Sequence, residues 1–135
     1  MLHPWGELRR LAHVIVIWAR PAPDKPAATD GERRIWLDPR MNQRERRCAL
    51  THELVHLVRG HRGCQPAAVE RDVRETAARA LVDWERLVAE FAWARSAGEL
   101  ADELWVTETV LKDLFASLSP DERQALALLE HQHQA

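Results

Sequence analysis

Hydrophobic residues follow a strand-like spacing near the N-terminus and a helical spacing over the rest of the chain. Residues 14–18 form a β-branched run that predicts a buried strand, and residues 34–37 predict a second strand that ends at an Asp-Pro pair. Ahead of them, residues 5–12 have the spacing of a short amphipathic helix. Between the strands, residues 21–31 contain three prolines and predict an exposed loop.

Helices are predicted over most of the chain after residue 42. Segment 43–59 contains neither Pro nor Gly, Asn42 and Glu45 predict a capping box at its start, and Gly60 predicts its end. Further helices are predicted over residues 66 or 67 to about 82, 84–94, 99–104 and 107–118, and from Pro120 onward. This order predicts an α+β fold, in which a small sheet of two or three strands packs on helix 43–59 and a helical C-terminal half follows.

Length and composition predict one domain with a hydrophobic core. The chain has 135 residues, of which 46% are hydrophobic and 30% are charged. We expect a single domain over residues 1–135, with an N-terminal half (1–83) and a helical half (84–135). The formal charge of -2 argues against a polyanionic partner, so we expect no contact with nucleic acid. The arginines at positions 44, 46 and 47 are interpreted as a solvated helix face.

The cysteines and the short apolar segments predict a cytoplasmic protein. Cys48 and Cys64 do not make a disulfide framework, and Cys48 lies inside the predicted helix, which indicates a reducing compartment. The only candidate membrane or export segment, residues 14–19, has six apolar residues and ends at Arg20. Both a signal peptide and a membrane span need more, so we expect no membrane association.

An HExxH motif, formed by His52, Glu53 and His56, lies in the middle of helix 43–59. Because four residues make about one helical turn, both imidazoles leave the same face and can bind one tetrahedral zinc ion, with Glu53 beside the open coordination position. The apolar residues around the motif form more than one stripe, so the helix is predicted to be buried. Inward-facing polar groups would each cost a few kcal/mol if unpaired. A metal ion accounts for them.

The third zinc ligand is expected on the helix that follows the motif. In gluzincin-type sites this ligand is a Glu, and the chain offers Glu70 and Glu75. At about 100° per residue, Glu70 lies at the margin of the main buried stripe, whereas Glu75 points nearly the opposite way. Glu70 is therefore favoured. A second, weaker apolar line that would include Glu75 keeps that residue as the alternative.

Other ligand arrangements fit the spacing less well. A metzincin site needs Gly three residues and His six residues after the second His of the motif. Here Gly60 and His61 follow His56 at four and five residues, so His61 is not expected to be a ligand.

The residue set predicts hydrolysis of a peptide bond. His52, His56 and Glu70 would hold one zinc ion per chain, with manganese as an alternative, and Glu53 would take a proton from water and pass it to the leaving amine. Strand 35–37 could present its edge to an extended substrate.

No tyrosine is available to stabilise the oxyanion. The candidates for that role are His61, Arg59 and Arg62, and the residues alone leave them unranked.

These residues resemble the ImmA/IrrE family of metallopeptidases. The family pattern has a short helix, a strand, a loop, a strand ending near Asp-Pro, then HELxH and a helix of the form ExxAxxFAxxLLMP. Here the motif reads HELVH, and the downstream helix starts its match at Glu70, with Val73, Thr76 and Asp83 in place of the usual Ala, Phe and Pro. The resemblance covers about residues 5–83 and implies that Glu70 is the zinc ligand.

The resemblance also implies a biological role. Members of the family typically cleave a helix-turn-helix transcriptional repressor encoded beside them, which derepresses a mobile element or a stress regulon. The alternative is a non-catalytic metal-binding regulator, or a toxin- or effector-type module, that binds a partner protein through the helical half. An intact Glu53 favours the enzyme, because a structural metal site has no use for a general base.

Residues 101–118 also suggest a DNA-binding helix-turn-helix by their spacing. However, Trp105 occupies the turn position that favours Gly, and Glu108 and Asp113 outnumber Lys112 on the would-be recognition helix. We therefore expect a helical pair that packs on the catalytic half. The six tryptophans are expected mainly to fill core and interface positions.

Overall fold

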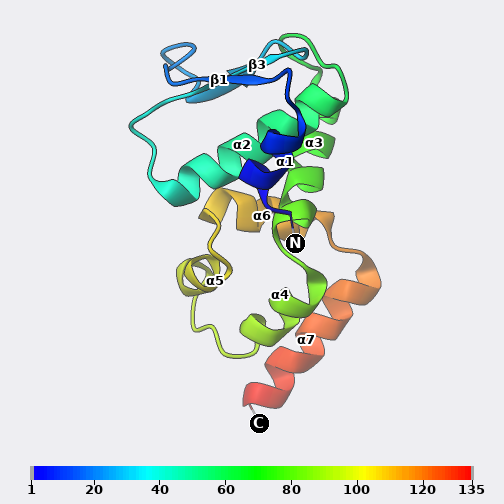
Figure 1. Cartoon of the computed structure of the whole chain (residues 1–135). Helices are drawn as coiled ribbons and strands as arrows, with labels where there is room; N and C mark the ends of the chain where they lie inside the picture. The colour runs from blue at the N-terminus through cyan, green and yellow to red at the C-terminus, as the bar shows by residue number, and fades with distance from the viewer. Residues whose placement is uncertain (1, 135) are drawn as a thin grey trace.

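The computed structural model describes residues 2–134 and the side chains of residues 2–130. Its elements in chain order are α1 (Pro4–Arg10), β1 (Ile15–Ile17), β2 (Ala27–Thr29), β3 (Arg34–Leu37), α2 (Gln43–Val58), α3 (Ala67–Leu81), α4 (Trp84–Phe91), α5 (Ala97–Leu104), α6 (Glu108–Ser117) and α7 (Pro120–Gln134). The sheet lies at one end of the molecule and α4, α5 and α7 at the other, with α2 and α3 between them (Figure 1). This is the α+β fold that the hydrophobic pattern predicts.

The three strands form a mixed sheet in the order β1-β3-β2, with β1 parallel and β2 antiparallel to β3. Strand β3 is central, and its Ile35 and Leu37 are fully buried. The prediction of a buried strand over residues 14–18 is wrong in part, because β1 is an edge strand and Ile15 is 49% exposed. The prediction of a loop over residues 21–31 is also wrong in part, because it contains β2. Alanine has a low propensity for strands, so the sequence of β2 gives little sign of a strand. The strand is stabilised by its pairing with β3.

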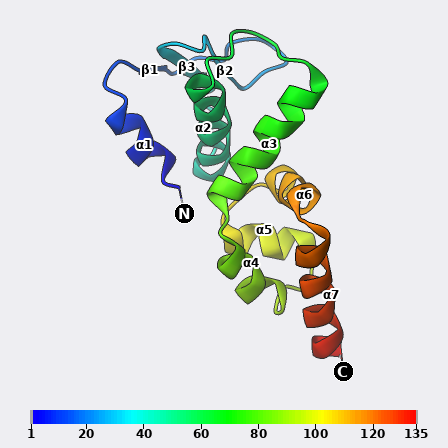
Figure 2. The ribbon, with the colours of Figure 1, turned by 90° about the vertical axis from the view of Figure 1, so that its right-hand side faces the viewer.

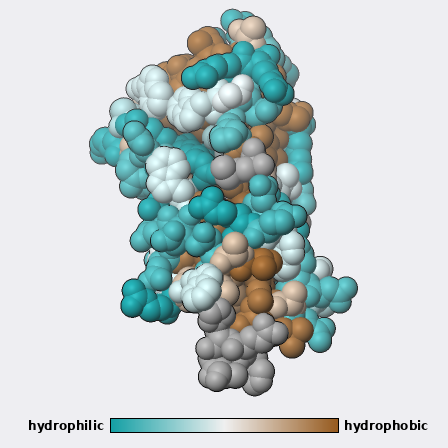
Figure 3. All heavy atoms as spheres, turned by 60° about the horizontal axis from the view of Figure 1, so that its bottom comes forward, coloured by the Kyte–Doolittle hydropathy of each residue, from teal (hydrophilic) through white to brown (hydrophobic). Residues whose placement is uncertain are grey.

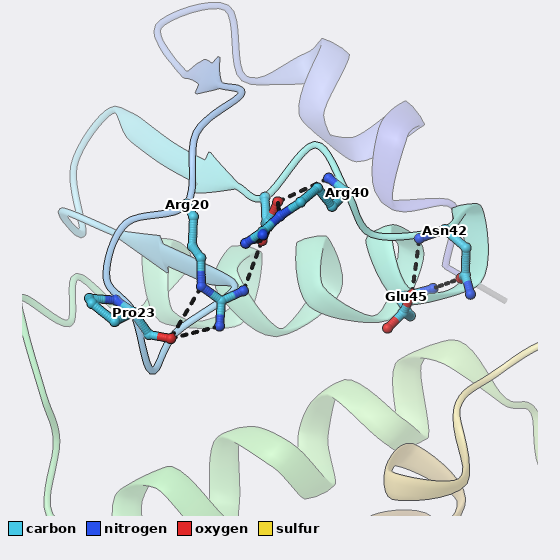
Figure 4. A network of polar contacts seen from close by, with 6 residues as sticks. Arg20, Pro23, Arg40, Asn42 and Glu45 are labelled. Carbon is cyan, nitrogen blue, oxygen red and sulfur yellow. Dashed lines mark hydrogen bonds and ion pairs between the residues drawn. The ribbon is translucent and has the colours of Figure 1, made fainter.

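Helix α2 begins and ends where its capping residues predict. The Asn42 side chain accepts a hydrogen bond from the Glu45 backbone N–H (2.8 Å), and the Glu45 carboxylate accepts one from the Asn42 backbone N–H (3.0 Å), as Figure 4 shows. Past the other end, Gly60 adopts a φ of +68°, which favours glycine. The HExxH motif therefore lies inside a regular helix, where its spacing has geometric meaning.

A buried carboxylate fixes the chain between β3 and α2. Asp38 is 3% exposed, and it accepts hydrogen bonds from Arg20 Nη1 (2.8 Å) and Arg40 Nη2 (2.9 Å). The same Arg20 guanidinium donates to the Pro23 carbonyl, which ties the loop before β2 to this turn (Figure 4). The hydrogen bonds from Arg40 and then Arg20 hold the pKa of Asp38 well below its usual range.

Two groups of buried hydrophobic residues lie on either side of α2. One lies between the sheet, α1 and α2, and includes Ile35, Leu50 and Leu54. The other joins Cys48 of α2 and the end of α3 to α4–α7. Helix α6 packs along α3, whereas α5 packs on α4 and α6, so the expected packing of this pair on the N-terminal half holds for α6 (Figure 2).

Several bulky side chains lie outside these buried groups. None of the tryptophans is fully buried, and Trp18, Trp93 and Trp105 are 48%, 73% and 45% exposed. Because Trp5 and Trp84 do pack against the buried groups, the expectation that the tryptophans mainly fill core and interface positions is wrong in part. The arginine stretch on α2 is not a solvated face either, because Arg47 is only 8% exposed. The exposure of the tryptophans and the burial of Arg47 both depend on contacts between residues far apart in the sequence. Hydrophobic side chains also reach the surface at the end of the helical half (Figure 3). Among the described residues, no helix combines the length and the hydrophobicity needed to cross a bilayer.

Candidate metal centre

Helices α2 and α3 lie side by side below the sheet (Figure 2), and together they carry three potential metal ligands. His52 and His56 leave the same face of α2 one turn apart, and Glu70 lies in the first turn of α3. Their ligand atoms all lie within 4.8 Å of one another. His52, His56 and Glu70, the three ligands predicted from the sequence, thus form a group that could hold a metal ion. Glu75, the alternative, is not part of it.

The spacing of the three ligand atoms suits a small tetrahedral ion. Zinc ligands at about 2.0–2.2 Å from the metal with tetrahedral angles lie about 3.3–3.6 Å apart. Glu70 Oε2 lies 3.1 Å from His56 Nε2 and 3.7 Å from His52 Nε2. Both histidines present the same ring nitrogen to the carboxylate, and because the ligand atoms lie within 4.8 Å of one another, a closing movement of about 1 Å would place all three around one ion.

Hydrogen bonds from the loop between α2 and α3 orient two of these ligands. His56 Nδ1 lies 3.0 Å from His61 Nδ1, and the His61 backbone N–H donates to the His56 carbonyl (3.0 Å). The Gln65 backbone N–H donates to Glu70 Oε1 (3.4 Å), which leaves Oε2 facing the histidines. His61 is outside the ligand group, as its spacing predicts, but it holds the ring of His56. Such partners fix the orientation and tautomer of a metal-binding imidazole.

Burial sets the protonation of the site. Burial, with a contribution from His56, lowers the pKa of His52 to about 4, and burial lowers the pKa of His56 too. Both rings are therefore neutral near pH 7, the form that binds a metal. Glu53 is only 7% exposed, and burial, followed by the Glu70 charge, raises its pKa to about 7. A carboxyl group with that pKa is suited to exchange protons near neutral pH.

The metal ligands and Glu53 line a cleft of about 690 Å³. Helix α2 forms its floor, the segment Lys25–Thr29 forms one wall, and α3, the loop after α2 and the start of α6 form the rest. Strand β2 forms part of that wall, and it is the edge strand of the sheet on the side of the cleft. The expectation that strand 35–37 presents an edge is wrong, because β3 is paired on both sides. A period-two pattern identifies strands but not their order in a sheet.

Of the three candidates for stabilising the oxyanion, His61 lines the cleft, whereas Arg59 and Arg62 do not. Arg59 pairs with Asp72 of α3 (2.5 Å), and Arg62 pairs with Glu32, so both are directed away from the cleft lining. Lys25 lies in the cleft wall, and its ammonium group is 3.1 Å from Cys64 Sγ. No local pattern identifies Lys25, because the loop that carries it reaches the site only through the pairing of β2 with β3.

Neither cysteine forms a disulfide: Cys48 is a buried free thiol and Cys64 an exposed one. Both line the cleft, although neither belongs to the three-residue ligand group.

Comparisons with family models, with curated proteins and with solved structures find no match for this chain. The functional proposal below rests on the ligand geometry, the buried glutamate and the sheet edge beside them.

Proposed function

We propose that the chain is a zinc-dependent endopeptidase in which His52, His56 and Glu70 hold the metal and Glu53 is the general base. The observation that carries the proposal is the placement of a buried glutamate next to a three-ligand group. A structural zinc site has four protein ligands, whereas a catalytic site has three and keeps one position open. His52, His56 and Glu70 would hold one zinc ion per chain and would leave one position for water or substrate; manganese is the alternative ion.

Bound in such a site, zinc polarises a carbonyl group and lowers the pKa of water. The proton transfers are carried out by Glu53. Glu53, ionised, accepts a proton from the attacking water and becomes a carboxylic acid, then donates that proton to the amine as the peptide bond breaks. A nearby cation lowers the pKa of a carboxyl group, so a bound metal would favour the ionised form of Glu53 that the first step needs.

The free edge of β2 is suited to hold an extended peptide across the cleft. Its other edge is paired with β3, so an added strand would continue the sheet through backbone hydrogen bonds. The small side chains of Ala27 and Ala28 leave room for a peptide along this wall. Their backbone groups are held in place by the pairing with Leu37 and Trp36 of β3. Binding through the backbone would place the scissile carbonyl near the ligands with little demand on substrate side chains.

Lys25 is the cationic residue best placed to stabilise the oxyanion. It lines the cleft with Glu53 and Glu70, and its positive charge acts on both carboxylates. A donor aimed at developing negative charge contributes to transition-state stabilisation rather than to ground-state binding. In our proposal Lys25 takes the role for which His61, Arg59 and Arg62 were the sequence-based candidates.

The substrate class follows from the resemblance to the ImmA/IrrE family. We propose a cytoplasmic enzyme that cleaves a helix-turn-helix repressor encoded by a neighbouring gene, and so derepresses a mobile element or a stress regulon. The test incubates the zinc- or manganese-loaded protein with the purified neighbouring gene product and, separately, with a proteome-derived peptide library. Mass spectrometry should detect new termini in the repressor that are absent with a chelator. If neither substrate is cut while the repressor is bound, a non-catalytic regulator replaces the enzyme.

A further inference from the structure

A second hollow opens on the face of α2 opposite the metal cleft. It measures about 810 Å³ and lies between α1, the N-terminal part of α2, Trp18 after β1 and the turn between α5 and α6. At about 100° per residue, Gln43, which lines it, and His52 differ by about 180° around the helix. None of the residues lining the hollow lines the metal cleft. We call this hollow the tryptophan groove.

Three indoles from distant parts of the chain meet in the tryptophan groove. Trp5 of α1 and Trp18 stack with ring centroids 5.9 Å apart and an interplanar angle of 21°. Trp105 lies on the same groove, and it and Trp18 each keep almost half of their surface exposed. Exposed indoles gathered in one hollow offer flat apolar faces to a planar ligand.

Three arginines line the tryptophan groove beside these rings. The Arg46 guanidinium lies 5.4 Å from the Trp18 ring centroid, and that of Arg47 lies 5.9 Å from the centroid of Trp105. Arg9 of α1 also lines the groove and is exposed. Among the described residues that line it, none is an Asp or Glu. The groove is therefore complementary to an anion that also carries an aromatic ring.

Two local features set this groove apart from ordinary surface packing. Trp105 has φ 55° and ψ 45°, a left-handed conformation that suits glycine and disfavours a bulky side chain. Its carbonyl accepts a hydrogen bond from Arg47 Nη1 (2.8 Å), which holds the turn in place. Arg46 Nε is buried and has no hydrogen-bond partner among the described residues. The bulky indole of Trp105 is held in a backbone conformation that disfavours it, and such strain is typical of functional positions, which indicates a use for the ring.

We propose that the tryptophan groove binds a mononucleotide, with the base stacked on the indoles and the phosphates held by Arg9 and Arg46. The volume is within the range of pockets for small ligands. Arginine binds phosphate oxygens through its planar fork of N–H donors. The stack of Trp5 and Trp18 and the ring of Trp105 supply the surfaces for the base.

A mononucleotide suits the groove better than a polymer or an acidic peptide. The whole chain has a formal charge of -2, and carboxylates such as Glu7 and Asp102 lie on the elements around the groove, which opposes a polyanion that would run beyond it. A peptide of Asp and Glu alone would use the arginines but has no planar ring to match the three indoles.

Fluorescence anisotropy with N-methylanthraniloyl-ATP and its GTP counterpart tests the proposal on the full chain. We expect saturable binding that unlabelled nucleotide reverses. Trp105→Gly should weaken binding by about tenfold or more, because a stacking surface is lost, and Arg9→Glu should do so because a cation is replaced by an anion. Trp105→Gly relieves the left-handed strain, so its thermal midpoint reports whether the fold is kept.

Matched controls use residues outside the groove. Trp93→Ala removes an indole that is 73% exposed, and Arg71→Glu reverses an exposed charge on α3, and both should bind nucleotide as the wild type does. His52→Ala should also bind normally, which separates this groove from the metal centre and from the proposed peptidase activity.

The proposal is overturned if neither nucleotide binds at millimolar concentration, or if the control variants lose as much affinity as the groove variants. Inorganic phosphate that competes as well as the nucleotide would show a simple anion site. Tighter binding of a fluorescein-labelled oligothymidylate or of a glutamate-rich peptide would assign the groove to a polymer instead. Each of these results contradicts the mononucleotide assignment.

Discussion

At the scale of single residues, the metal centre is defined by which ring nitrogen and which carboxylate oxygen face one point. His52 Nε2, His56 Nε2 and Glu70 Oε2 converge, while Glu70 Oε1 accepts from Gln65 and His56 Nδ1 faces His61. The ligands thus come from two helices, and the loop between the helices supplies their orientation. The short α2–α3 connection is therefore part of the site.

Glu70→Gln and Glu75→Gln form a matched pair that tests the ligand assignment. The amide removes the anionic ligand at Glu70, so zinc affinity should fall by more than about 100-fold, beyond the 10–100-fold typical of outer-shell changes. Glu75 is outside the ligand group, so its variant should bind zinc as the wild type does. Competition with a fluorescent zinc chelator measures both constants. The reverse order of the two losses would mean that Glu75 is the ligand.

His61→Ala tests the orienting hydrogen bond on His56. Loss of a partner of a metal-binding imidazole should weaken zinc binding by about 10–100-fold without changing the stoichiometry. His61→Gln keeps a side chain able to accept from His56 Nδ1 and should recover part of the affinity. His13→Ala changes an exposed histidine outside the site and serves as the control. Unchanged affinity in His61→Ala would assign His61 no role in holding the metal.

At the scale of helices and strands, the parts governed by local spacing were predictable and the parts governed by pairing were not. The capping box, the HExxH face and the position of Glu70 depend on residues a few positions apart in a helix, so periodicity locates them. Strand β2 is short and rich in Ala, and only its partner β3 makes it a strand. The cleft wall that contains Lys25 and the burial of Arg47 depend on segments distant in sequence, which no local pattern encodes.

The turn between β3 and α2 gives a pH-dependent contribution to stability through Asp38. Its pKa is lower in the folded protein than the unfolded value of about 3.9, because Arg40 and Arg20 donate hydrogen bonds to the carboxylate. The contribution is therefore fully present above about pH 4 and is lost as the pH falls towards the folded pKa. Asp38→Asn should lower the thermal midpoint at pH 7.

The difference between wild type and Asp38→Asn should shrink as the pH falls below about 4. Thermal denaturation followed by circular dichroism at a series of pH values measures it. Asp24→Asn, an exposed carboxylate in the preceding loop, is the control and should show no such trend. A constant difference across the acidic range would show that the asparagine acts through packing and not through charge.

At the scale of the whole molecule, the metal would join the two hydrophobic groups. Helix α2 contacts the sheet, while α3 continues into the helical half, and the ligands bridge these two helices. An ion that binds only the folded state stabilises it by about 2.7 kcal/mol at a free concentration 100 times its dissociation constant.

Chelation should therefore lower the thermal midpoint of the zinc-loaded wild type. Differential scanning calorimetry with and without a chelator measures the change, and His56→Ala should show none. An equal shift in His56→Ala would mean that the ion stabilises the fold from another site. No shift in either protein would show that the ligand group does not bind zinc when folded.

The single-turnover cleavage rate of Glu53→Gln relative to the wild type, at equal zinc content, tests the central claim most directly. The amide keeps the size of Glu53 and removes the base, so one zinc per chain should remain while the rate on the repressor or on a library peptide falls about 10²–10⁴-fold or more. A Glu53→Gln protein that binds zinc and cuts as fast as the wild type would contradict the peptidase mechanism.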